Sequence, residues 1–179
     1  DPSYQHAEVV YRDMDTVDFS DMEKARACLY TVKPDVVINC AAMTNVNACE
    51  TELDTAMKAN AILPMNLAVL CQELGAKLVH TSTDYVFAGD ESTPRKEWDH
   101  TAPVTAYGKS KELGETLVRQ CCTKSFIVRT AWLYGYVGNN FVKTMCRLAR
   151  ENGKVKVVND QFGNPTSAND LAYHILKLA

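Results

Sequence analysis

The sequence predicts an α/β fold in which a doubly wound parallel sheet carries helices on both faces. Short β-type runs alternate with amphipathic helical runs along the 179 residues, and this alternation is typical of βαβ units. The run at 36–41 is nearly all apolar, as expected of a parallel strand buried on both faces. The stretch at 51–74 has a helical pattern that stops at Gly75, a residue that favours helix ends.

Each expected element has a local reason in the chain. The expected strands are the apolar runs at 7–11, 36–41, 78–81, 126–130 and 155–158. The expected helices begin at Ser20 or Asp21, at 51, 105 and 140, and after Ser167, which is a good N-cap. Pro64 is expected to kink the second of these helices or to divide it in two. Residues 84–103 read as a loop.

Composition excludes several classes of protein. The net charge of −3 leaves no basic surface for nucleic acid, and no apolar stretch is long enough to span a bilayer. The seven cysteines show no Cys-x-x-Cys pair, so neither a disulfide framework nor a metal site is expected, and a reducing cytoplasm fits best. The first six residues do not resemble a signal peptide. The expected partner is therefore a small molecule.

Tyr107 and Lys111 are the first candidate pair for chemistry. They stand at i and i+4 near the start of a predicted helix, so both side chains lie on one face. An ammonium beside a phenol favours the phenolate and lowers its pKa, which makes the pair a usable proton donor for a carbonyl. An isolated Tyr-x-x-x-Lys match is more often a solvated helix face.

The position of Thr83 favours the catalytic interpretation of the Tyr107–Lys111 pair, because Thr83 lies just beyond the predicted strand at 78–81. In open parallel sheets, ligands bind beyond the carboxyl ends of the strands. A hydroxyl there can hydrogen-bond the oxygen of the same carbonyl. The alternative is a turn in which Thr83 caps the backbone together with Asp84.

With these residues in this order, the chain resembles the extended short-chain dehydrogenase/reductase family, and within it the dTDP-4-dehydrorhamnose reductases. The resemblance implies a Rossmann-type, NAD(P)-binding domain over residues 1–179, with 131–167 contributing to the substrate side. It keeps its order along nearly the whole chain and is carried by the segments 33–42, 81–87, 107–111, 129–135, 138–145 and 159–166.

The resemblance implies a role for several residues. Thr83, Tyr107 and Lys111 match the catalytic triad of the family. Thr83, Asp84 and Trp132 match positions at the sugar nucleotide. The positions that match cofactor-lining residues are Asp13, Asp18, Phe19, Ala42, Met43, Thr44, Tyr107 and Lys111. NADPH or NADH is the implied cofactor, and the resemblance also leaves room for magnesium and for a homodimer.

Plainer roles stay open for some of these residues. Asp13 resembles the acid that holds an adenosine ribose, whereas Arg12 beside it would favour a 2′-phosphate. Trp132 can be a core residue, and Ala42 can be present for close packing alone. Asn140 can simply cap the next helix.

The chain departs from the family at its start. The opening strand and the glycine-rich turn that receives the cofactor pyrophosphate have no counterpart. We expect the missing strand to lie between the strands at 7–11 and 78–81, and we expect the chain by itself to be inactive. Ala88 also replaces a usual acidic residue, and Met43 a usual aromatic one.

Three functions remain at this stage. The first is reduction of the 4-keto group of dTDP-4-dehydro-L-rhamnose to dTDP-L-rhamnose, with Tyr107 as the proton donor. The second is a non-catalytic, reductase-like binding or regulatory subunit. The third is another sugar-nucleotide epimerase or dehydratase of the same family. The intact Thr83, Tyr107 and Lys111 favour the first over the second.

Overall fold

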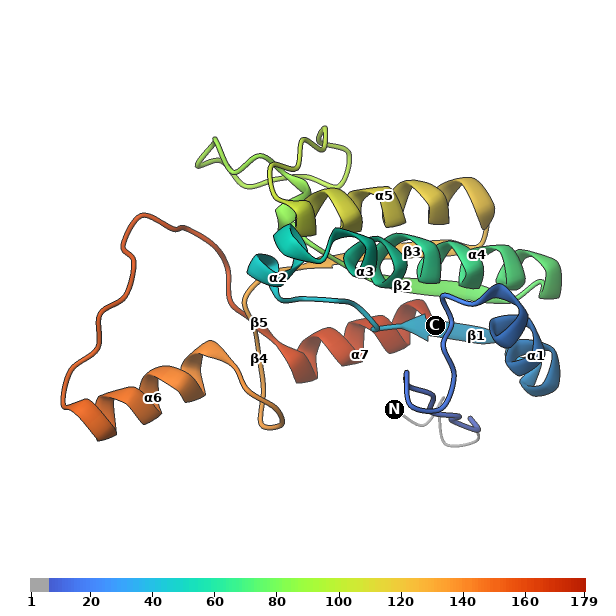
Figure 1. Cartoon of the computed structure of the whole chain (residues 1–179), viewed down its shortest axis with the longest axis horizontal. Coiled ribbons are helices and arrows are strands. Elements are labelled where there is room, and N and C mark those ends of the chain that lie inside the picture. The colour runs from blue at the N-terminus through green and yellow to red at the C-terminus, as the bar shows by residue number, and fades with distance from the viewer. Residues whose placement is uncertain (1–6) are drawn as a thin grey trace.

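The computed structural model describes residues 7–179, and these residues form a three-stranded parallel sheet between two layers of helices (Figure 1). Residues 1–6, which we do not expect to be a signal peptide, lie outside the described part of the chain. The strands stand in the order β1 (Val36–Asn39), β2 (Lys77–Thr83), β3 (Ser125–Thr130).

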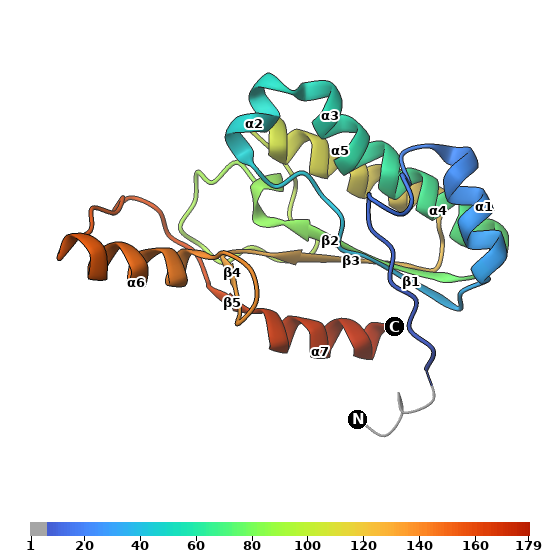
Figure 2. The same cartoon turned by 60° about the horizontal axis from the view of Figure 1, so that its bottom comes forward.

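Helices cover both faces of this sheet (Figure 2). One face carries α1 (Met22–Val32), α2 (Val46–Thr51), α3 (Leu53–Met57), α4 (Leu63–Leu74) and α5 (Ala106–Cys121). The other face carries α7 (Ala168–Leu178). The predicted doubly wound α/β fold with a parallel sheet is therefore confirmed.

The ends of these helices are set by the residues that the sequence marks. The Asp21 side chain accepts hydrogen bonds from two amides in the first turn of α1. Thr105 caps α5 in the same way, and Ser167 caps α7. Gly75 ends α4 with a φ of 72°, in the left-handed region that glycine adopts at little cost. Capping side chains of this kind stabilise a helix by about 1 kcal/mol each.

The helix expected at 51–74 is divided, but not at Pro64. The chain turns at Glu52 between α2 and α3, and a π-helical turn, η2 (Lys58–Ile62), then leads directly into α4. Pro64 sits in the first turn of α4 and has no N–H to donate to the carbonyl four residues earlier, that of Asn60. The irregular turn associated with Pro64 therefore lies about one helical turn before the proline, and not at the proline itself.

Two of the expected strands do not form. Residues 7–11 and 155–158 are irregular, and their apolar side chains are largely exposed, Tyr11 at 84% and Val158 at 64%. A strand is stable only when it hydrogen-bonds to a neighbour, and no strand among residues 7–179 lies beside either run. The two strands predicted from β-propensity alone, at 7–11 and 155–158, are therefore wrong.

The position of the open edge also differs from the prediction. β2 pairs with β1 on one side, as in Asn39 opposite His80, and with β3 on the other, as in Thr83 opposite Thr130. The strand at 78–81 is thus central and faces no gap. In the described residues, the edge nearest the N-terminal segment is β1.

Beyond β3 the chain leaves the main sheet. Leu133–Tyr134 (β4) and Thr166–Ser167 (β5) form a small parallel sheet, which the sequence did not predict. Between them α6 (Phe141–Asn152) projects away from the main body and has no buried residue (Figures 1 and 2).

The largest core lies between β2 and the helices α1, α4 and α5. Its members are small or aliphatic, which allows these helices to pack closely on the sheet. They are Ala25, Leu29, Leu63, Leu67, Ala68, Leu70, Cys71, Ala76, Leu78, Val118 and Cys122. This core fixes α5 on β2, and the candidate site lies where those two elements meet.

Candidate functional site

The three residues predicted to be catalytic meet at the carboxyl end of β2. Thr83 is the last residue of that strand, and Tyr107 and Lys111 lie one turn apart on the first half of α5. All three are buried, with 6%, 8% and 2% of their surface exposed. The solvated-face alternative for the Tyr107–Lys111 pair is therefore wrong.

The phenol of Tyr107 is held in a buried setting beside Thr83. Burial raises the pKa of Tyr107, and the nearby Asp84 carboxylate raises it further, while a hydrogen bond with the Thr83 side chain acts in the opposite direction. The lowered pKa predicted from the neighbouring Lys111 is therefore wrong. The reason is that desolvation of the buried phenolate outweighs the hydrogen bond with Thr83, which acts to lower the pKa. A raised pKa keeps the phenol protonated and therefore able to donate.

Lys111 uses its ammonium to reach the sheet. Its Nζ donates a hydrogen bond to the carbonyl of Thr81 at 2.8 Å. Burial lowers the pKa of Lys111 to about 8, although Glu115 and Cys40 act to raise it. At neutral pH the side chain is therefore mostly a cation, buried under the site.

Thr83 has the turn-capping role that the sequence left open, and its contact with a substrate carbonyl stays a prediction. Its Oγ1 donates to Asp84 Oδ1 at 3.1 Å and accepts from the Tyr85 amide at 3.2 Å, so it caps the 3-10 turn η3 (Asp84–Val86). The same hydroxyl lies against Tyr107. The turn thus fixes the Thr83 hydroxyl beside the phenol of Tyr107. Tyr85 stacks edge-on against Tyr107, with ring centroids 5.4 Å apart.

Two buried asparagines, which the sequence analysis did not single out, hold the loops predicted to line the cofactor. Asn60 accepts a hydrogen bond from the Met43 amide at 2.8 Å and donates to the Met43 carbonyl at 3.0 Å. Asn66 donates to the carbonyls of Phe19 and Ser20, at 3.0 Å each. An amide in the buried stripe of an otherwise apolar helix needs partners, and that was the available signal.

The residues of the two loops, around Phe19 and around Met43, are more exposed than the asparagines that hold them. Ala42 and Met43 are half-buried and Thr44 is exposed, directly beyond the carboxyl end of β1. Asp18 accepts two hydrogen bonds from Ser20, which hold the pKa of its carboxyl below the usual value. Both loops therefore have a fixed backbone and at least one solvent-facing side.

Asp13 lies apart from these loops. It follows no strand, and its carboxylate accepts hydrogen bonds from the amide and the hydroxyl of Thr16 in an exposed turn. Its predicted place after a second strand is thus wrong, because that strand does not form. Its predicted contact with the cofactor stays a prediction.

Beneath the site, β1 and β2 share a buried pair, Asn39 and His80. The side-chain Oδ1 of Asn39 accepts from the Ala41 amide at 3.0 Å, so the side-chain Nδ2 faces His80 Nδ1, also at 3.0 Å. His80 Nδ1 must then accept, and the proton lies on Nε2, which has no hydrogen-bond partner among residues 7–179. Burial lowers the pKa of His80 to about 3, helped by the Lys111 charge, so the imidazole is neutral.

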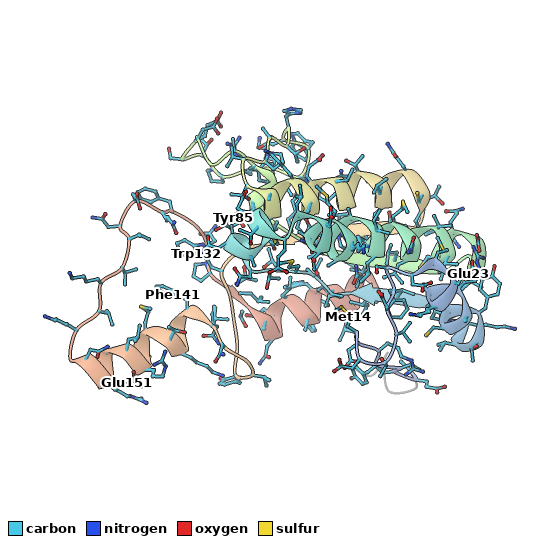
Figure 3. All side chains as sticks on the ribbon, viewed as in Figure 1. Met14, Glu23, Tyr85, Trp132, Phe141 and Glu151 are labelled. Carbon is cyan, nitrogen blue, oxygen red and sulfur yellow. The ribbon has the colours of Figure 1, made fainter. Side chains whose placement is uncertain are left out.

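Trp132 is not a core residue. It is 47% exposed and adopts a φ of 48°, which is uncommon for a bulky side chain. It lies just after β3, at the same end of the sheet as Tyr85 (Figure 3). Its ring packs against Gly163, where an added Cβ would come within 3.0 Å of the indole. The core alternative is therefore wrong, and contact with a substrate stays a prediction.

These residues fit the nicotinamide end of a dinucleotide. Two hydroxyls, those of Thr83 and Tyr107, and the buried Lys111 ammonium lie at the carboxyl end of β2, and the loop that Asn60 holds follows the carboxyl end of β1. For magnesium, in contrast, residues 7–179 contain no group of three or more His, Cys, Asp or Glu side chains that could hold a metal ion. No helix in the same range is both long and apolar enough to cross a membrane.

Comparison with known proteins gives a consistent result. The family described as "RmlD substrate binding domain" matches residues 3–179. The chain is 43% identical over 165 residues to dTDP-4-dehydrorhamnose reductase of Shigella flexneri, covering 90% of this chain and 55% of that protein. It is 43% identical over 171 residues to the spore coat polysaccharide biosynthesis protein SpsK of Bacillus subtilis, covering 96% of this chain and 60% of that protein.

Solved structures agree in fold. A dTDP-4-dehydrorhamnose reductase from Clostridium acetobutylicum superposes with a TM-score of 0.95 at 46% identity, covering 97% of this chain and 62% of that one. The enzyme of the same name from Bacillus anthracis, solved in complex with NADP, gives 0.94 at 44% identity over the same shares.

The chain thus spans about half to three fifths of the length of the curated relatives that it matches. Within that span the similarity covers both the Tyr107–Lys111 helix and the strands on which the site is built. By this match, the chain belongs to the RmlD substrate binding domain family.

Proposed function

We propose that this chain supplies the reaction centre of a dTDP-4-dehydrorhamnose reductase, which reduces the 4-keto group of dTDP-4-dehydro-L-rhamnose to dTDP-L-rhamnose. The observation that carries the proposal is the convergence of Thr83, Tyr107 and Lys111 at the carboxyl end of β2. The proposed substrate comes from the name of the 43%-identical Shigella flexneri relative, dTDP-4-dehydrorhamnose reductase.

In our proposal each of these three residues has one task. Tyr107, kept protonated by burial, donates its proton to the 4-oxygen of the sugar. Thr83, fixed by the η3 turn, hydrogen-bonds the same oxygen and orients it. The Lys111 ammonium stabilises the phenolate that remains after proton transfer.

NADPH or NADH supplies the hydride when it is bound. In our proposal the loops around Phe19 and Met43, held by Asn66 and Asn60, face this cofactor. The NADP complex of the Bacillus anthracis relative favours NADPH.

Residues 131–167 contribute to the substrate side in this proposal. Trp132 presents a half-exposed ring at the carboxyl end of β3, and Asp84 lies exposed beside Thr83. An indole face and a carboxylate suit a sugar nucleotide, because the ring stacks on the base or sugar and the carboxylate accepts from hydroxyls.

A Tyr107→Phe variant of the complete protein that carries this sequence tests the proposal. The change removes only the hydroxyl and should lower kcat by about 10²-fold or more, the usual scale of general acid catalysis. NADPH oxidation with the keto sugar is the measurement. Tyr173→Phe, an identical change on the distant α7, is the matched control and should keep its rate.

The outcomes separate the three functions. Keto-dependent NADPH consumption that Tyr107→Phe abolishes supports the reductase. Substrate or cofactor binding by the wild type without any turnover would identify a non-catalytic subunit. Conversion of the sugar without net NADPH consumption would identify an epimerase or dehydratase.

A further inference from the structure

The helix that carries Tyr107 and Lys111 carries a third buried polar residue at the same spacing, Glu115. The three residues are four positions apart, so they form one stripe along α5 that faces the sheet. Glu115 is fully buried, with 0% of its surface exposed. A buried carboxylate is costly unless it is paired, so its presence beside a reaction centre needs an explanation.

The pairing of Glu115 is unusually complete. Arg129 on β3 binds it with two hydrogen bonds, from Nε to Oε1 at 2.8 Å and from Nη2 to Oε2 at 2.6 Å. Arg119, one turn further along α5, donates to Oε2 at 2.7 Å. Burial acts to raise the pKa of Glu115, but these contacts prevail and lower it, so the carboxylate is ionised at neutral pH.

Lys111 lies one helical turn before Glu115, on the same buried stripe of α5. Its ammonium is buried, and among residues 7–179 it donates its hydrogen bond to a neutral carbonyl, that of Thr81. Three groups face it from the surrounding elements: Glu115 on α5, His80 on β2 and Cys40 after β1. His80 is neutral, and burial raises the pKa of the Cys40 thiol, so Cys40 is protonated as well. Glu115 is the anion of this group.

We propose that Glu115 is a positioning residue for the reaction: its ionised carboxylate, held by Arg129 and Arg119, keeps the Lys111 side chain charged beneath Tyr107. The proposal rests on the proposed function of Tyr107 and Lys111. It adds a second task to a residue that would otherwise only tie α5 to β3. A purely structural Glu115 would matter equally at every pH, whereas a charge-holding Glu115 matters most where Lys111 begins to lose its proton.

The first test reads the Lys111 charge directly. In the complete protein, labelled at lysine Cε, the Lys111 NMR signal is identified by its absence in a Lys111→Met variant and is titrated with pH. Glu115→Gln should lower the pKa of Lys111 by about 1 or more, the effect expected from losing one nearby opposite charge. Glu112→Gln, the same change one turn away on α5 and outside the stripe, should leave it in place. An unchanged Lys111 titration in a folded Glu115→Gln variant would overturn the proposal.

The second test reads the reaction. In Glu115→Gln, the fall of kcat/KM at alkaline pH should begin at a lower pH. If the pKa of Lys111 moved from 8 to 7, about one tenth of Lys111 would be charged at pH 8 instead of about one half, so kcat/KM would fall about fivefold. At pH 6 Lys111 would stay almost fully charged, and kcat/KM would hardly change. Glu115→Asp keeps the charge and should restore the wild-type profile in part. An equal loss at every pH would show a structural role alone.

A third variant protects the test if Glu115→Gln does not fold. Arg119→Met removes a half-exposed cation and leaves Glu115 less neutralised. It should therefore raise the pKa of Lys111, and an unchanged or lower value would contradict the proposal. The NMR measurement needs no turnover. If Lys111 titrates as expected in the wild type and in Glu115→Gln but the wild type reduces no keto sugar, the proposed function is contradicted, while the electrostatic effect of Glu115 on Lys111 is still supported.

Discussion

The side-chain amide of Asn60 forms hydrogen bonds with both backbone groups of Met43, its amide at 2.8 Å and its carbonyl at 3.0 Å. A third bond joins Asn60 Nδ2 to Ser110 Oγ on α5, also at 3.0 Å. One residue in the π-helical turn η2 thus connects the loop after β1 with the helix of Tyr107 and Lys111. A π-turn in this place is consistent with the frequent occurrence of such turns at functional sites.

We expect Asn60→Leu to loosen the 41–44 loop. The variant keeps the size of the side chain and removes its hydrogen bonds, which leaves the two Met43 groups without a partner at a cost of about 1–3 kcal/mol each. Urea unfolding should show the lower stability, and an NADPH titration of the folded variant should show weaker binding. Asn47→Leu, on the exposed side of α2, is the control. Unchanged affinity and stability in Asn60→Leu would show that the loop holds itself.

Gly114→Ala should be among the most damaging single-methyl changes in α5. An added Cβ would lie 2.1 Å from the Asn60 carbonyl oxygen, the group that Pro64 leaves without a helical donor. Backbone has to move, so we expect a loss of about 3 kcal/mol, the upper end for overpacking. Gly89→Ala has open space and only its positive φ to overcome, about 1–2 kcal/mol. Equal melting temperatures for the two variants would contradict the close approach of α5 and η2.

Trp132→Phe should change substrate use more than stability. The ring is half exposed, so little buried area is lost, while the indole face offered at the carboxyl end of β3 becomes smaller. A raised KM for the sugar nucleotide with a melting temperature within about 2 °C of the wild type is the expected result. If the melting temperature fell by several degrees and KM and kcat stayed the same, Trp132 would be a packing residue after all.

The stability of the protein should depend on pH through His80. Its pKa is about 3 in the folded state and 6.5 as the reference value, so the unfolded chain binds a proton between these values and the folded chain does not. Stability should therefore fall as the pH drops from 6.5 towards 3, by at most about 1.4 kcal/mol per pH unit from this group. His80→Gln keeps an acceptor for Asn39 and should flatten this slope, measured by urea unfolding at several pH values.

His174→Gln is the matched control for that experiment. His174 lies exposed on α7, so its loss should leave the acid slope as in the wild type. The same slope in wild type and His80→Gln would mean that His80 is solvated in the folded protein.

The sequence was sufficient for the parts of the site that follow local rules. Tyr107 and Lys111 share a helix face because of their spacing, and Thr83 is near them because strands in such a sheet end at one edge. The fold class followed in the same way from the alternation of strands and helices.

What could not be predicted depends on contacts between distant segments. Asn60 and Asn66 bind loops that lie 17 and 47 residues away in the chain, and no local pattern indicates such partners. The pKa of Tyr107 depends on how deeply the packed helix buries it, so the direction of the shift predicted from the sequence was wrong. The runs at 7–11 and 155–158 have strand propensity, but propensity does not provide a neighbouring strand.

The stripe of Tyr107, Lys111 and Glu115 on α5 has a consequence for insertions and deletions. One residue added within that helix would turn everything after it by about 100° and advance it by about 1.5 Å, so the three side chains would no longer face the sheet together. The 88–104 segment just before the helix has no regular structure, and a residue added there would leave their spacing unchanged. Length variation compatible with activity should therefore accumulate ahead of Thr105, while 107–115 keeps a fixed number of residues.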